Sequence, residues 1–146
     1  MKYTSKQVQI FQDEETIFNV LSSFSNFSPV LAYKVEGWEA THNHCSFKAQ
    51  GFTIGLKMVE QDPYNTIKIT NDDTTPFQFA FWVQLKQAEP GDTRMRLVLD
   101  VELNSMMKML VGSKLQEALN KIAEQIATAF NTRADFFTVN NTELVN

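Results

Sequence analysis

The chain has 146 residues, of which 43% are hydrophobic and 12% aromatic, so it fits one globular domain with a sizeable core. Its 13 basic and 17 acidic residues give a net charge of −4 without a basic stripe, which argues against a nucleic-acid partner. The one cysteine, Cys45, excludes an internal disulfide and favours a reducing compartment. We find neither a secretion signal nor a membrane span of roughly 20 apolar residues, and therefore expect a cytoplasmic protein.

The first third of the chain predicts one strand and two short helices. Residues 3–11 have the composition of a strand, and Asp13 then offers an N-cap for a helix through about residue 23. Ser28 and Pro29 suit the first turn of a second short helix, which we expect to end near residue 33.

The middle of the chain changes to the two-residue period of half-buried strands. Six strands are expected there, at residues 35–41, 45–50, 52–59, around 67–69, 77–86 and 94–103. The last two alternate most regularly and flank a turn at residues 89–92. Because short turns join these strands, we expect neighbours in sequence to pair antiparallel.

The C-terminal part predicts one long helix over residues 105–131, with Ser105 as its cap. Its apolar stripe consists of Met107, Val111, Leu115, Leu119, Ile122, Ile126 and Phe130. A helix of this length is a rod of roughly 39 Å, long enough to cross a whole sheet. Residues 1–131 are thus the predicted domain, and residues 132–146 a loosely attached tail.

The predicted fold class is α+β. We expect a seven-stranded, curved antiparallel sheet that grips the long C-terminal helix, because that helix is the one element large enough to cover the apolar face of the sheet.

This order of elements resembles the START-like superfamily, also called SRPBCC, with its helix-grip fold. The likeness is carried by residues 17–24, by Asn26 and Phe27 after them, and by residues 110–130. The superfamily includes polyketide cyclase/dehydrase and lipid-transport proteins. The resemblance implies a cavity between sheet and long helix that often takes an apolar or amphipathic ligand. It implies no universal catalytic set, and we transfer no catalytic residue.

A search for reactive residues identifies no catalytic constellation and no cofactor. His42 and His44 have a spacing that could bind a metal on a strand, but an exposed turn is favoured, so we predict no metal site. Ser105 and Lys108 match an S-x-x-K pattern whose companion motifs are absent. Cys45 lies in an alternating strand and is interpreted as an inert core thiol.

The remaining signal is apolar, and it predicts a cavity between sheet and helix. The expected lining residues are Phe47, Phe52, Ile54, Met58, Phe79, Phe81, Met95, Leu97, Leu99, Met107, Val111, Gly112 and Leu115. The expected mouth residues are Tyr33, Glu36, Trp38 and Tyr64. A glycine within a helix costs about 1 kcal/mol relative to alanine, so Gly112 either leaves room for a ligand or allows close packing against a side chain.

The leading hypothesis from the sequence is a protein that binds a small apolar or amphipathic ligand in this cavity. One alternative is a polyketide cyclase/dehydratase-type enzyme, which requires convergent polar groups inside the cavity. Another is a protein-interaction module with a filled core that works through its surface. An exposed patch on the outer face, where Trp82 and Val98 lie, or a homodimer through that face, would support this alternative.

Overall fold

The structure, a computed structural model, describes residues 1–49, 51–75 and 77–132. Its elements in chain order are β1 (Lys2–Thr4), β2 (Val8–Ile10), α1 (Glu14–Leu21), a 3₁₀ turn (Phe24–Phe27), α2 (Ser28–Leu31), β3 (Glu36–Ala40), β4 (His44–Ala49), β5 (Phe52–Asp62), β6 (Thr66–Asn71), β7 (Phe79–Glu89), β8 (Asp92–Val101) and α3 (Ser105–Thr132). Beyond Thr132, the predicted tail lies outside the described residues.

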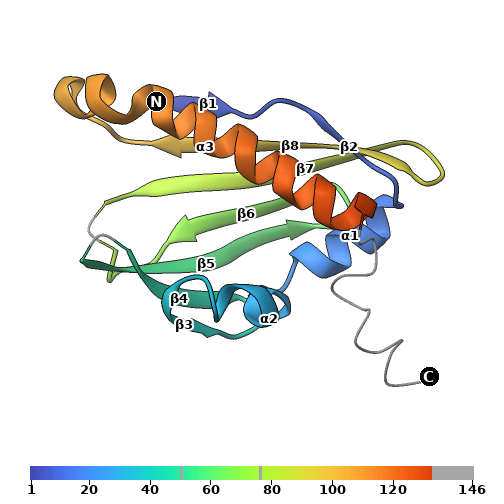
Figure 1. The fold of residues 1–146 in the computed structure, drawn as a ribbon, viewed down its shortest axis with the longest axis horizontal. Coiled ribbons are helices and arrows are strands. Elements are labelled where there is room, and N and C mark those ends of the chain that lie inside the picture. Colours follow the sequence, from blue (N-terminus) through green and yellow to red (C-terminus); the bar gives the residue numbers. More distant parts are fainter. Residues whose placement is uncertain (50, 76, 133–146) are drawn as a thin grey trace.

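All strands form one antiparallel sheet, in the order β1-β8-β7-β6-β5-β4-β3, and β2 also pairs with β8 (Figure 1). Consecutive strands from β3 to β8 are neighbours in space, as short connections require. The predicted fold class is confirmed: a sheet of antiparallel strands is covered on one face by a long C-terminal helix. We call the face toward α3 the helix-side face.

The strand expected over residues 3–11 is divided in two at Ser5. Its backbone N–H donates to the carbonyl oxygen of Leu97 over 2.8 Å, and its hydroxyl accepts from the backbone N–H of Leu97, also over 2.8 Å. The side chain therefore replaces a backbone acceptor where the chain leaves the regular ladder. Both backbone groups of Leu97 remain satisfied, which a fully buried residue requires.

Two helix starts differ in detail from the prediction. The cap of α3 is Asn104 rather than Ser105, because the Asn104 Oδ1 accepts from the Met107 N–H over 2.8 Å. Asp13 occupies the N-cap position of α1, but its carboxylate accepts from the Gly91 N–H over 2.7 Å instead of capping the helix. Asp, Asn and Ser can all cap a helix, and at Asp13 a tertiary contact with Gly91 takes the carboxylate away from that role.

The long helix is fastened along one edge of the sheet and packs mainly against β1, β2 and β8. Gln116 Nε2 donates to the Thr4 carbonyl over 2.8 Å. Near the other end, Asn131 accepts from the Phe11 N–H and donates to the Gln9 carbonyl, each over 2.8 Å. Amide side chains on α3 thus satisfy backbone groups of the first segment, and this fixes the lateral position of the helix.

The smaller helix α1 covers one end of the strands. Glu14 at its start exchanges hydrogen bonds with Gln87 near the end of β7, over 2.9 and 3.2 Å. Ile17 and Phe18 of α1 join the core beside Phe130 of α3, and all three are almost fully buried. At the other end of β7, α1 makes no such contacts.

Candidate functional site: an apolar cavity beside α3

A cavity of about 650 Å³ lies on the helix-side face, at the end of the strands that α1 does not cover. Every described residue that lines it is apolar: Phe47, Ala49, Phe52, Ile54, Leu56, Ile69, Phe77, Phe79, Phe81, Leu99, Val101, Leu115 and Ile122. Phe52, Phe77 and Ile122 are 52%, 45% and 42% exposed, so the cavity opens to solvent beside them.

The boundary between cavity and solid core runs across the strands. Ile69, Phe81 and Leu99 are paired across β6, β7 and β8, and all three line the cavity. Two residues along the same strands, Ile67, Val83 and Leu97 form the next row on the same face. That row is buried in the core, Ile67 and Leu97 with no exposed surface.

The positions of the helices explain why the cavity lies at this end of the helix-side face. The closest contacts of α3 with the sheet are to β1, β2 and β8, which lie at one side of the sheet. Buried Ala123 and Ala127 allow its C-terminal half to approach the sheet closely, and α1 fills the space beside that half. At the other end, Leu115 and Ile122 form only one wall of an open cavity.

The structure brings many of the predicted lining residues together, and it separates the others from the cavity. Those that line it are Phe47, Phe52, Ile54, Phe79, Phe81, Leu99 and Leu115. Those that do not are Met58, Met95, Leu97, Met107, Val111 and Gly112. Met95 and Leu97 are fully buried core residues, whereas Met107 is 45% exposed on α3.

Gly112 does not provide space for a ligand. A Cβ built on it would lie 3.2 Å from the Tyr3 hydroxyl, so the side chain of Tyr3 occupies the room that the glycine leaves. The Tyr3 oxygen is buried and has no hydrogen-bond partner among the described residues. Of the two explanations offered by the sequence, close packing is the one observed.

The predicted lining omits Ala49, Leu56, Ile69, Phe77, Val101 and Ile122. Five of these precede or follow a core-facing residue by two positions along a strand pattern, for example Val101 after Leu99. All five already lie on the apolar side of the period-two pattern, so taking every apolar-side residue of the strands would have included them. Ile122 belongs to the apolar stripe of α3, but a stripe does not indicate which of its members face a void.

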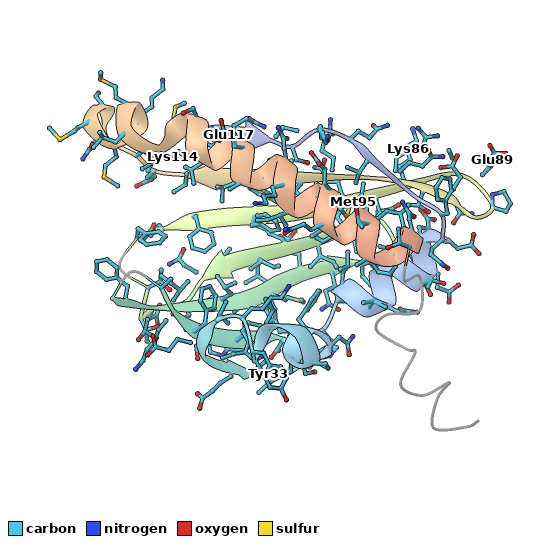
Figure 2. The ribbon with its side chains drawn as sticks, viewed as in Figure 1. Tyr33, Lys86, Glu89, Met95, Lys114 and Glu117 are labelled. Atoms are coloured by element: carbon cyan, nitrogen blue, oxygen red, sulfur yellow. The ribbon has the colours of Figure 1, made fainter. Side chains whose placement is uncertain are left out.

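The predicted mouth residues lie in different places. Trp38 stacks on Phe47 with ring centroids 6.3 Å apart, and its Nε1 donates to the Ser28 hydroxyl over 2.9 Å. Tyr33 is 90% exposed and lies at the α2 side of the sheet, away from α3 (Figure 2). Trp38 thus supports a cavity wall, whereas Tyr33 makes no part of it.

Glu36 and Tyr64 also lie outside the cavity lining. Glu36 is exposed and borders a separate, polar surface pocket together with Lys48 and Thr53. Tyr64 packs edge-on against Phe18 at a centroid distance of 5.6 Å, at the α1 end of the molecule, and its hydroxyl contacts Glu15 over 3.4 Å.

A polar cluster on the outer face fixes the connection between β6 and β7. The Asp72 carboxylate accepts from the N–H and hydroxyl of Thr74 over 2.9 and 2.6 Å, and contacts His44 Nε2 over 2.9 Å. The Thr75 hydroxyl accepts from the Gly55 N–H over 2.8 Å and donates to its carbonyl over 3.0 Å. This connection leads to Phe77 at the opening of the cavity.

Gly55 is the residue that admits this cluster. A Cβ added there would overlap the Asp72 carboxylate, which therefore lies directly against the backbone of β5. Hydrogen bonds from Thr74 and then His44 hold the pKa of Asp72 well below its usual range. The charged carboxylate stabilises the connection, but it lies on the face of the sheet opposite to the cavity.

The cavity itself offers no group for acid–base or nucleophilic chemistry, because its described lining carries no titratable side chain. Cys45 is fully buried, and burial, followed by the nearby charge of Asp72, raises the pKa of its thiol to about 12. Within the described ranges, no three metal-ligating side chains come together. The described lining can exclude water from an apolar molecule.

Comparison with solved structures identifies the fold. A truncated norcoclaurine synthase from Thalictrum flavum matches with a TM-score of 0.68 at 7% identity, over 89% of this chain and 93% of its own. The Aha1 dimer from Colwellia psychrerythraea matches with a TM-score of 0.61 at 13% identity, over 88% of this chain and 95% of its own. A START superfamily protein from Mycobacterium smegmatis matches with a TM-score of 0.56 at 17% identity, over 86% of this chain and 98% of its own.

The chain has the helix-grip fold of the START-like proteins. No protein-family profile and no curated protein sequence matches it, and identities of this size establish the fold alone. Within this START-like fold the cavity lies between the sheet and α3. Among the described residues, no helix is both long and apolar enough to cross a bilayer.

Proposed function

We propose that this START-like protein binds a small apolar or amphipathic molecule in the cavity beside α3. The single observation that carries the proposal is a space of about 650 Å³ whose described lining is apolar throughout. Burial of apolar surface contributes about 25 cal/mol per Å², so an apolar ligand is favoured there without any specific polar contact. The exposed opening at Phe52, Phe77 and Ile122 leaves a polar end of such a ligand in solvent.

Two alternatives have less support. A cyclase/dehydratase-type reaction requires polar groups that converge on the substrate, and the described lining offers none. A module with a filled core is at odds with the cavity. A homodimer through the outer face would be a separate assembly, and sedimentation velocity measures it independently of ligand binding.

The test is direct binding of the apolar fluorophore N-phenyl-1-naphthylamine, together with a variant that fills the cavity. Ala49→Phe places a ring among the lining residues, and Ala88→Phe places the same ring at an exposed position of β7 as the matched control. We expect saturable binding to the wild type, an affinity about tenfold lower for Ala49→Phe, and no change for Ala88→Phe. Absence of saturable binding to the folded wild type would rule out the proposal.

A further inference from the structure

The first turns of α3 form an apolar segment that no other described residue covers. We call residues 105–110 the α3 arm. Every residue of the arm is exposed, and Met106, Met109 and Leu110 are 72%, 88% and 63% exposed. Figure 1 shows the arm reaching past the ends of β1 and β8. Because a helix that is apolar on most sides is normally buried, the arm indicates a contact with another apolar medium.

The charge of this segment differs from that of the whole chain. Between Leu103 and Leu115 the sequence carries two lysines, Lys108 and Lys114, and no acidic residue, whereas the chain as a whole has a net charge of −4. Lys114 is exposed near the start of α3 (Figure 2). Basic side chains beside exposed apolar ones complement a surface that is negatively charged above an apolar interior.

The size of the apolar segment argues against a second copy of the chain as its partner. A stable protein interface buries roughly 800 Å² on each side, and the arm offers only Met106, Met107, Met109 and Leu110. Three of these are unbranched methionines, which adapt to a fluid environment rather than to one fixed pocket. A few such side chains suffice for reversible contact with the interfacial layer of a bilayer.

We propose that the α3 arm docks the protein reversibly on an anionic lipid surface. Met106, Met109 and Leu110 enter the interfacial layer, and Lys108 and Lys114 face the lipid headgroups. The arm contributes no residue to the cavity lining, so lipid docking and ligand binding are separate properties that separate measurements address.

The test is co-sedimentation of the full chain with vesicles of phosphatidylcholine, alone or with about a quarter phosphatidylglycerol. The arm variant combines Met106→Gln, Met109→Gln and Leu110→Gln, which keep good helix formers at exposed positions. The matched control is Phe11→Gln, because Phe11 is 59% exposed beside Asn131, at the opposite end of α3. We expect the arm variant to bind the anionic vesicles at least tenfold more weakly, and the control to bind like the wild type.

A second variant isolates the charge. Lys108→Glu with Lys114→Glu is expected to abolish the preference for anionic vesicles, and added salt is expected to weaken wild-type binding. Equal vesicle binding by the wild type and the arm variant, or none by the wild type, overturns the proposal. A concentration-dependent dimer that the arm variant loses, without vesicle binding, also overturns it and assigns the arm to a second copy. Unchanged fluorophore binding by the arm variant confirms that its cavity is intact.

Discussion

At the scale of single residues, the chemistry of the molecule is determined by burial more than by residue type. Cys45 is the one thiol and lies next in sequence to His44, an arrangement that could indicate a nucleophile. The structure buries Cys45 completely in the core, while His44 contacts Asp72 on the outer face. Consecutive residues of a strand point to opposite faces of the sheet. The thiol and the imidazole therefore lie on different faces, although the two residues are neighbours in the sequence.

The burial of Cys45 predicts a thiol that does not react in the folded protein. Because its pKa is raised to about 12, only on the order of 1 in 10⁴ molecules carries the thiolate at pH 8. We expect iodoacetamide to leave native protein unlabelled over hours and to label protein in concentrated urea within minutes, as intact mass shows. Native labelling at the denatured rate would contradict this description of the core.

Asp72 predicts a pH-dependent contribution to stability. Its pKa is lower in the folded protein than in the unfolded chain, so its contribution is fully present above about pH 4 and is lost as the pH falls through the folded value. At pH 7 we expect Asp72→Asn to lower the free energy of unfolding by about 1 kcal/mol, because the hydrogen bonds from Thr74 are weakened.

Urea denaturation across pH measures this contribution. The difference between wild type and Asp72→Asn should shrink as the pH is lowered below about 4, since Asp72 of the unfolded wild-type chain then takes up a proton that the folded protein does not yet bind. A difference that stays constant from pH 7 to pH 3 would show that the carboxylate charge is not what stabilises the β6–β7 connection.

At the scale of elements, the position of α3 depends on a contact that the sequence left ambiguous. Gly112 lets the helix approach the Tyr3 hydroxyl, which is buried without a partner. A buried hydroxyl that lacks a hydrogen bond costs about 1–3 kcal/mol. The helix and β1 therefore pack closely here at the expense of one unsatisfied polar group.

This contact predicts that substitutions at Tyr3 and Gly112 are coupled. We expect Tyr3→Phe to raise the free energy of unfolding by about 1 kcal/mol, because the unsatisfied oxygen is removed. Gly112→Ala gains about 1 kcal/mol in helix propensity, but in the wild type its Cβ would lie 3.2 Å from the hydroxyl and lose that gain. In the Tyr3→Phe background the gain should appear in full.

Thermal and urea unfolding of the four proteins gives the coupling free energy, which we expect to be about 1 kcal/mol. Ser113→Ala is the control for helix propensity, since Ser113 is exposed on the same turn of α3. If Gly112→Ala has the same effect in both backgrounds, the Tyr3 hydroxyl does not limit the approach of α3.

At the scale of the whole molecule, the cavity results from covering a broad sheet with α3 along one side and α1 at one end of the strands. The two helices meet over one end of the strands, where the core is solid. The cavity at the other end is lined by the same strands. Because its described lining offers no polar contact, we expect affinity to depend on the apolar length of a ligand rather than on its headgroup.

A series of linear alcohols tests this dependence. Each added methylene contributes about 0.8 kcal/mol when it is buried, or about a fourfold decrease in Kd. We measure the Kd of each alcohol by its displacement of the bound fluorophore. From hexanol upward we expect this decrease in Kd for each added methylene, until the alkyl chain reaches the opening beside Ile122. For Ala49→Phe the increments should stop at a shorter chain. Affinity that does not change with chain length would contradict binding in an apolar cavity.

The order of elements, the face of each strand and the amphipathic long helix, and therefore the fold, follow from the sequence alone. Periodicity carries this information, because a period of two or of 3.6 residues specifies which side chains share a face. It placed Leu99 and Leu97 of β8 on one face, together with Phe81 and Val83 of β7, and the structure agrees.

Which end of that face is open cannot be inferred from the alternation and depends on long-range packing. Leu99 and Phe81 line the cavity, whereas Leu97 and Val83 lie in the core two residues away, and nothing in an alternating pattern distinguishes them. The difference arises from what lies opposite each row. What lies opposite each row depends on the positions of α3 and α1. These positions are fixed by hydrogen bonds from the amide side chains of α3 to residues 4–11 and from α1 to β7, all between residues far apart in the chain.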